Sequence, residues 1–358
     1  MLHRLRPAGV ACALVLSGAS AALAQVTPAA GYTPPDDTPS VKVGGTIFMD
    51  YTYTSSPEAT DANGNKYHPS DFDVSRAYIN VTGNVSHLVS FRITPDITRV
   101  GSGDLELRLK YAFAQINLDD WLPRGTWIRF GQQQTPLIDY QEGIYRYRFQ
   151  GTTFSEREGL LTSSDVGASF HSAFANNYAE VHAGIYNGEG YHAPEANNQP
   201  SLQIRGTVRP FARGPLPARG LRFTGFYDGD HYAKDSEKTR ALFEASFEHQ
   251  YLNAAFDYVA AHDEKTPAAL DVHGQGWSAW VTPRSRVGIE GLFRYDHYTP
   301  NTSFDSQVHK RAIVGIAYWF PHTGSATSAF LIDYDDATFD NVPQARQRKI
   351  AVHALVNF

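Results

Sequence analysis

From Val43 to Phe358 the chain divides into short segments in which apolar and polar side chains alternate with a period of two. This is the period of a β-strand, whose successive side chains point to opposite faces. Connections after even-numbered segments are short, such as Gly83-Asn84 and Gln250-Tyr251, whereas most of those after odd-numbered segments are long. The alternation predicts an antiparallel sheet whose two ends carry loops of different kinds.

The pattern favours an all-β fold, namely a transmembrane antiparallel β-barrel of about 16 strands. Short periplasmic turns and longer external loops would join tilted strands of about ten residues. A secreted β-sandwich, propeller or lectin is the soluble alternative, but it would not explain two classes of loop. The predicted strands are Val43–Tyr53, Phe72–Thr82, His87–Ile97, Asp104–Leu118, Thr126–Gln132, Leu161–Ser172, Tyr178–Asn187, Ser201–Phe211, Leu221–Asp228, Thr239–His249, Leu252–His262, His273–Thr282, Arg286–His297, Gln307–Phe320, Ser325–Tyr334 and Arg346–Phe358.

The two faces of the predicted strands differ in polarity. In the segment Asp104–Leu118, the apolar face carries Leu105, Leu107, Leu109, Tyr111 and Phe113, and the other carries Glu106, Arg108 and Lys110. In the segment Arg286–His297, Ile289, Phe293 and Tyr295 oppose Glu290, Arg294 and Asp296, and Val352 and Val356 share a face of the last strand. An apolar face toward lipid and a charged face toward a water-filled lumen would explain the pattern.

Composition excludes other classes of protein. A mean hydropathy of -0.37 and a single long apolar run, at the N-terminus, argue against a helical polytopic membrane protein. Aromatic residues at 13% are too many for a disordered chain. With only one cysteine, the core cannot depend on a disulfide.

The N-terminus has the features of a secretory signal. Arg4 and Arg6 precede a short apolar stretch and an A-x-A cleavage pattern that ends at Ala24. We therefore expect a signal peptide over residues 1–24, a proline-rich flexible leader over 25–42 and the barrel over 43–358. The expected location is the outer membrane of a Gram-negative bacterium, in contact with outer-membrane lipid and lipopolysaccharide.

Arginine dominates the cations of the predicted lumen. A row of guanidinium groups along a pore would concentrate anions. The alternative is a lumen of mixed charge, in which these groups pair with Glu106, Glu180, Glu244, Glu248, Asp257, Glu290 and Asp296. The arginines with inward parity are Arg76, Arg92, Arg108, Arg129, Arg205, Arg209, Arg222, Arg240 and Arg294.

The stretch Gln133–Gly159 is too long for an ordinary connection. We expect it to fold inward as the third loop and to narrow the pore. Its candidate solute-binding side chains are Arg146, Arg148, Arg157, Tyr145 and Tyr147, facing an acidic wall of Glu142, Glu156 and Glu158. The alternative is an external loop whose charges pair on its surface.

The runs WIRFGQQQTP (127–136), EGIYRYRF (142–149), EREG (156–159) and RLKYAFAQ (108–115) resemble the phosphate-selective porin O/P family. The resemblance implies a 16-stranded trimeric channel with an arginine ladder and an inward third loop. Lysine assists the anion site in that family, and Lys110 is the one plausible lumen lysine here. A terminal strand ending in Phe358 also resembles the assembly signal of bacterial outer-membrane proteins.

These features predict a passive diffusion channel for small hydrophilic solutes that prefers anions such as phosphate. A broad, weakly selective porin is the second hypothesis, and an outer-membrane enzyme or adhesin is the third. The sequence shows no catalytic, nucleotide-binding or H-x-x-x-H zinc motif, so no enzyme activity, metal site or cofactor is predicted. No basic patch predicts binding to nucleic acid.

Overall fold

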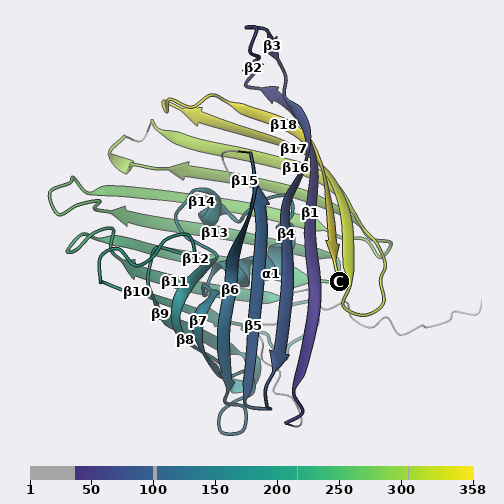
Figure 1. The fold of residues 1–358 in the computed structure, drawn as a ribbon, viewed down its shortest axis with the longest axis vertical. Coiled ribbons are helices and arrows are strands. Elements are labelled where there is room, and N and C mark those ends of the chain that lie inside the picture. The colour runs from purple at the N-terminus through teal and green to yellow at the C-terminus, as the bar shows by residue number, and fades with distance from the viewer. Residues whose placement is uncertain (1–36, 100–102, 216, 305) are drawn as a thin grey trace, which may run out of the picture.

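The computed structural model describes residues 37–99, 103–215, 217–304 and 306–358, and these form a closed barrel (Figure 1). The predicted signal peptide and most of the predicted leader lie outside the described residues. Strand β1 begins at Ser40, so the barrel starts three residues earlier than expected. The barrel strands are β1 (Ser40–Ser56), β4 (Ser70–Asn84), β5 (Val89–Arg99), β6 (Leu105–Asn117), β7 (Trp127–Gln134), β8 (Ser164–Phe174), β9 (Ala179–Tyr186), β10 (Ser201–Val208), β11 (Leu221–Asp230), β12 (Lys238–His249), β13 (Leu252–Asp263), β14 (Val272–Pro283), β15 (Ile289–Thr299), β16 (Val308–Trp319), β17 (Thr327–Asp340) and β18 (Gln347–Asn357).

Each barrel strand pairs in antiparallel fashion with its sequence neighbours, and β1 closes the barrel against β18. The closing pairs run from Thr46↔Asn357 onward, and Thr46 Oγ1 donates a hydrogen bond to Asn357 Oδ1 at 2.7 Å. A closed barrel leaves no unpaired strand edge in the bilayer. The predicted sixteen-stranded antiparallel barrel is therefore confirmed. No helix in the described part of the chain is long and apolar enough to cross a membrane.

Two features of the connections differ from the prediction. The first long loop carries a small hairpin of its own, β2 (Ala59–Thr60) and β3 (Lys66–Tyr67), which projects beyond the barrel rim in Figure 1. On the short-turn side, the connections 118–126 and 209–220 are exceptions to the rule of short turns, and each is slightly longer than the predicted strand ends imply. Asp119 organises the first of these by accepting backbone hydrogen bonds from Gly125 and Thr126.

The predicted polarity of the two faces is confirmed for most strands. Leu107 and Phe293 on the outer face are 69% and 46% exposed, and Leu109, Ile289, Val352 and Val356 are exposed with them. Glu290 and Arg294 point into the barrel and are 5% and 4% exposed. Apolar side chains therefore form the surface that lipid would contact, as in a transmembrane barrel.

The prediction was wrong for Tyr111 and Phe113, which lie inside the barrel and are each 7% exposed. The pairing of β5 with β6 runs Thr94↔Tyr111 and then Pro95↔Leu109, so Lys110 has no partner in the register. This β-bulge inserts one residue, and one extra residue reverses the side-chain parity of everything beyond it. Proline lacks a backbone N–H, so Pro95 suits a position where the ladder is interrupted.

Candidate functional site

A long segment between β7 and β8, residues 135–163 and here called the inner loop, folds into the barrel. It contains helices α1 (Ile138–Tyr145) and α2 (Phe154–Arg157), and α1 is visible within the barrel in Figure 1. From α1, Gln141 Nε2 donates hydrogen bonds to Glu244 Oε2 on β12 at 2.9 Å and to Asp257 Oδ1 on β13 at 3.2 Å. Asn253 on β13 donates to the carbonyl of Ile144 at 2.9 Å. The inner loop therefore crosses the lumen to the far wall.

Aromatic side chains anchor the inner loop to the strands β12–β18 and β1, here called the docking wall. Tyr147 packs edge-on against Trp319, with ring centroids 5.7 Å apart, and Tyr145 packs in the same way against Trp280 at 5.1 Å. Phe149 contacts Trp319 and is 3% exposed. Apolar lumen residues of the wall complete this cluster: Phe48, Ala255, Leu292, Ile313, Ala317, Ala329, Leu331 and Leu355. Burial of each large side chain contributes about 1.5–3 kcal/mol, so the loop is firmly attached.

Helix α2 makes a second anchor. Phe154 is 2% exposed and packs against Tyr298 of β15, with ring centroids 6.3 Å apart. It also lies over Gly276 of β14, where a Cβ atom would come within 2.9 Å of the Phe154 ring. Glycine at this strand position therefore makes room for the loop.

The three arginines predicted as the anion site of the inner loop lie inside the barrel, and each faces a carboxylate. Arg146 Nη1 lies 3.4 Å from Glu290 Oε1, and its guanidinium sits 4.1 Å from the Trp319 ring centroid. Arg148 Nε lies 2.7 Å from Glu142 Oε1. Although burial alone would lower the pKa of Arg148, the neighbouring carboxylates Glu142 and Glu156 raise it. The charge of each of these two arginines is therefore largely compensated.

Arg157 is held more loosely than the other two loop arginines. Its Nη2 donates to Gln150 Oε1 at 3.2 Å, and its Nη1 is 4.0 Å from Asp296 Oδ2. Burial, together with the nearby cations Arg294 and Arg311, lowers the pKa of Arg157 to about 10. The group stays charged at neutral pH.

Arg294 and the two predicted tyrosines connect the docking wall with the inner loop. Arg294 makes a bidentate ion pair with Asp296, with its Nη2 2.7 Å from Oδ2, and also donates to the carbonyl of Thr152 in the inner loop at 2.8 Å. The Tyr147 hydroxyl donates to Glu290 Oε2 at 3.0 Å and accepts from Trp319 Nε1 at 3.2 Å. Tyr145 and Tyr147 are each at most 2% exposed, so both pack the loop and are not on the open lumen surface.

The opposite side of the lumen, formed by β4–β7, carries five cations and is here called the basic wall. Its members are Arg76, Arg92, Arg108, Lys110 and Arg129. Arg76 Nη1 and Arg108 Nε share one carboxylate, Asp96 Oδ2, at 2.6 and 3.0 Å. Within the described residues, Asp96 is the one carboxylate that forms an ion pair with this wall.

Arg92, Lys110 and Arg129 are held by neutral groups. Arg92 donates to Asn80 Oδ1 at 2.8 Å and lies 4.6 Å from the Tyr111 ring centroid. Arg129 donates to Gln115 Oε1 and Gln134 Oε1, and its guanidinium lies 3.9 Å from the Trp127 ring centroid.

Lys110 Nζ lies 5.1 and 5.5 Å from the ring centroids of Tyr78 and Tyr111. The bulge at Lys110 thus turns Tyr111 and Phe113 inward, where both support cations: Phe113 lies 4.5 Å below Arg129. No ion pair joins Arg92, Lys110 or Arg129 to a carboxylate of the described residues.

A cavity of about 190 Å³ lies between α1 and strands β8–β11. Arg205, Arg209 and Arg222 line it, as their inward parity predicted. Arg205 and Arg209 both bind Glu180, at 2.6 and 2.5 Å, and Arg205 also stacks on Tyr140, 4.3 Å from its ring centroid. The other lining residues are Pro136, Asp139, Tyr140, Ile144, His171, Glu180 and His182.

Sequence reasoning missed Asp139, Tyr140 and His182 as members of this site. Asp139 stands in the first turn of α1, and burial raises the pKa of its carboxyl group. The cations Arg129, Arg92, Arg205 and Lys110 act in the opposite direction on Asp139, which shows that the inner loop places a carboxylate in the field of the basic wall. No sequence pattern linked Asp139 to these cations, because the contact depends on how the loop enters the barrel.

Comparison with known proteins gives matches at the level of the fold. No family model matches the chain, and no curated protein matches it in sequence. An anion-selective porin from Comamonas acidovorans has a TM-score of 0.62 at 9% identity, over 90% of this chain and all of that one. OmpF of Salmonella typhi, solved in complex with daunomycin, also has a TM-score of 0.62, at 11% identity, over 89% of this chain and 97% of that one.

A third similar structure is the outer-membrane channel DcaP of Acinetobacter baumannii, with a TM-score of 0.60 at 11% identity, over 92% of this chain and 99% of that one. The closed sixteen-stranded barrel and its apolar outer surface define the chain as an outer-membrane β-barrel protein of a Gram-negative bacterium. More narrowly, its fold is the one found in outer-membrane porins.

Proposed function

We propose that the chain is a passive diffusion channel of the outer membrane that favours small anions such as phosphate. The inner loop narrows a lumen lined with charged groups, which is the arrangement expected of a selective pore. The candidate selectivity groups are the cations of the basic wall together with Arg205, Arg209 and Arg222 around the cavity. Arg129, Lys110 and Arg205 are 1%, 3% and 4% exposed, so these three would act on a solute through their electric field and not by direct contact. The anion selectivity named for the Comamonas porin agrees with this proposal but concerns a protein of only 9% identity.

One observation carries the anion preference: Arg92, Lys110 and Arg129 lack carboxylate partners among the described residues. A cation held by amides and aromatic rings keeps its field for a passing solute, whereas an ion pair cancels most of it. At an effective dielectric constant of about 20, a unit charge 4 Å away changes the energy of an anion by about 4 kcal/mol before dehydration is counted. Three such groups suffice to bias a narrow pore toward anions.

The test is the reversal potential of single channels in a planar bilayer across a KCl gradient. Wild-type protein should favour chloride, and Arg92→Gln should move the potential toward the cation side. Arg346→Gln is the matched control, because Arg346 pairs with Asp336 on the outer face, away from the lumen. If Arg92→Gln and Arg346→Gln both keep the wild-type potential, the proposed role of the basic wall is wrong.

The ion pairs of the inner loop favour a second candidate, a broad and weakly selective porin. Arg146, Arg148 and Arg157 each have a carboxylate within 4.0 Å, so the positive charges of the inner loop are paired. A wild-type reversal potential near zero would support this candidate over the first. Blocking of chloride current by added phosphate would support the first.

We also propose that the chain is related to the phosphate-selective porin O/P family and assembles as a homotrimer. The sequence resemblance and the trimer form described for OmpT of Vibrio cholerae, a similar barrel at 13% identity, support this. Native gels of detergent-extracted protein should show a species of about three chains that dissociates on heating. A monomer band that heating does not change would count against the trimer.

We propose no enzymatic activity. Ser169 and His171 share a face of β8, and both are engaged with other groups. Ser169 Oγ donates to Gln133 Oε1 at 2.5 Å, and His171 Nδ1 lies 2.7 Å from the carbonyl of Gly125. A nucleophile and its base must contact each other, and these two do not.

A further inference from the structure

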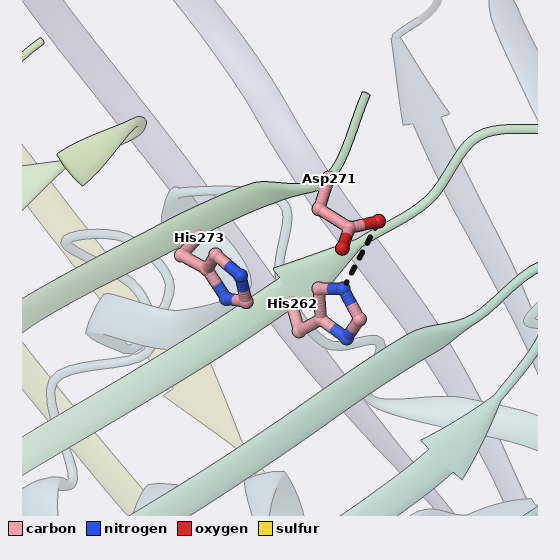
Figure 2. Close-up of side chains that lie close together, drawn as sticks. All are labelled: His262, Asp271 and His273. Carbon is pink, nitrogen blue, oxygen red and sulfur yellow. Dashed lines mark ion pairs between the residues drawn. The ribbon is translucent and has the colours of Figure 1, made fainter. Parts of the chain in front are cut away.

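Two histidines and an aspartate lie close together at the end of the barrel where a loop joins β13 to β14 (Figure 2). His262 near the end of β13 is the cross-strand partner of His273 near the start of β14, and their imidazole rings stack with centroids 4.6 Å apart. Asp271 comes from the loop that joins the two strands, and its carboxylate points at the His262 ring (Figure 2). One ligand atom from each of the three residues lies within 4.8 Å of the other two.

The cluster is on the outer surface of the barrel and is separate from the lumen. Along β13, the residues with the parity of His262 are exposed, including Phe256 and Tyr258, whereas Asp257 and Val259 are buried inside. The loop 264–271 belongs to the long-loop end of the barrel, which is the predicted external end. The site is therefore open to the external medium at the height of the barrel rim.

The geometry around His262 suits a metal ligand. Its Nδ1 lies 3.3 Å from Glu237 Oε2, and its Nε2 lies 3.6 Å from Asp271 Oδ1. The Nε2 atom is shielded from solvent and makes no hydrogen bond to the described residues. A separation of 3.6 Å is long for a hydrogen bond. Two ligands about 2.0–2.2 Å from one tetrahedral ion lie roughly 3.3–3.6 Å apart, which matches the separation of these two atoms.

A second carboxylate is placed to orient the imidazole. If Nδ1–H of His262 donates to Glu237, the lone pair of Nε2 is left for a metal, as in carboxylate–histidine–metal arrangements. Glu237 is held beside the site because its carbonyl accepts a hydrogen bond from the Glu264 N–H at 2.8 Å. The loop before β12 therefore supplies the support for a ligand on β13.

We propose that His262, His273 and Asp271 bind a divalent transition-metal ion of the zinc type, with Glu237 as a positioning residue for His262. Imidazole nitrogen favours zinc, copper and nickel over calcium or magnesium, which prefer oxygen. Three protein ligands leave one tetrahedral position for water or an external anionic group. The site is independent of the proposed channel activity.

The experiment measures zinc binding to refolded barrels that carry no polyhistidine tag. Isothermal titration and metal analysis after dialysis should give one tightly bound Zn²⁺ per chain in the wild type. His273→Ala should weaken this binding at least tenfold, and Asp271→Asn should weaken it less. His297→Ala is the matched control, because His297 lies on the outer face of the adjacent strand β15 and stacks on Trp277. It should bind zinc as the wild type does.

Cobalt provides a second measurement that does not depend on affinity alone. Co²⁺ in the wild type should give the visible absorption of a tetrahedral nitrogen and oxygen site, and His273→Ala should lose it while keeping the heat-dependent gel shift of a folded barrel. Equal zinc binding by wild type, His273→Ala and His297→Ala would overturn the proposal. So would a wild-type protein that retains no zinc after dialysis.

Discussion

The two sides of the lumen use arginine in opposite ways. On the docking wall, Arg294 binds Asp296, Arg311 binds Asp335 and Arg284 binds Glu290, with nitrogen–oxygen distances of 2.7, 2.8 and 2.9 Å. On the basic wall, only Arg76 and Arg108 of the five cations form an ion pair with a described residue, and both bind the same carboxylate, Asp96. The number of arginines alone therefore says little about a pore's selectivity, because pairing decides which of them a solute can sense.

The two walls differ in ion pairing because only the docking wall holds the inner loop in place. The docking wall must hold the inner loop, and buried ion pairs there satisfy groups that the loop removes from water. The basic wall supports its cations with aromatic rings and amides, such as Tyr111 beside Arg92 and Gln115 beside Arg129. These neutral supports fix a cation in position while leaving its charge uncompensated.

Glu290→Ala should have the largest effect on stability. Glu290 accepts hydrogen bonds from Arg284, Arg146 and Tyr147, so its loss leaves the guanidinium groups of Arg284 and Arg146 without their shared carboxylate. Breaking a buried pair costs roughly 3–5 kcal/mol. Urea unfolding in lipid vesicles, followed by tryptophan fluorescence, would measure this change in the free energy of unfolding. Asp336→Asn is the control: it disturbs the exposed pair with Arg346 and should cost under about 1 kcal/mol. Equal losses would show that the inner loop does not depend on Glu290.

Lys110→Met tests the opposite wall and should change stability in the other direction. Lys110 is 3% exposed and has no ion-pair partner among the described residues, so replacing it with an apolar side chain of similar length removes the desolvation cost of a buried charge and should be neutral or stabilising. The same change should reduce anion preference. At about 8 Å, with an effective dielectric constant of about 20–80, one charge is worth roughly 0.5–2 kcal/mol, or about 2- to 30-fold in relative permeability. If Lys110→Met destabilised the barrel and left its selectivity unchanged, Lys110 would have a structural role like that of the docking-wall cations and would not act on the solute.

Much of the fold could be predicted from the sequence, because a membrane barrel imposes a strict local rule. Every strand must alternate lipid-facing and lumen-facing residues, so Phe293 and Arg294 could be assigned to their faces from their order alone. The rule failed at Lys110, where a bulge reversed the parity of Tyr111 and Phe113. A bulge depends on the pairing with β5, and a single strand's sequence does not contain that pairing.

The site was less predictable, because ion pairs and metal ligands form between strands that are distant in sequence. Arg146 meets Glu290 only after the inner loop has crossed the lumen. His262 and His273 do not form an H-x-x-x-H motif, because strand pairing and not helical spacing brings these two histidines together. Cross-strand register is therefore the information that sequence motifs lack.

The double variant Glu142→Gln, Arg148→Gln should leave selectivity nearly unchanged. The pair is formed at 2.7 Å, so removing both partners removes no net charge from the lumen. Arg148→Gln alone should shift the reversal potential toward cations, because Glu142 and Glu156 then lose their shared partner. A double variant that shifts as far as the single one would show that Arg148 acts on the solute directly.

Acidification should produce the smallest effect, through Asp139. Burial raises the pKa of Asp139, so this carboxylate gains a proton at a higher pH than an exposed aspartate does. Its neutralisation removes a negative charge from the field of Arg92, Lys110 and Arg129, so anion preference should rise as the pH falls from neutral toward about 5.

The measurement for Asp139 is the reversal potential of wild type and Asp139→Asn at both pH values. His171 and His182 line the same cavity as Asp139, so only the difference between the two proteins reports on Asp139. The variant should start with the higher anion preference and respond less to acid. If both proteins respond equally, Asp139 does not set the field of the basic wall, and the histidines of the cavity become the better explanation of any pH dependence.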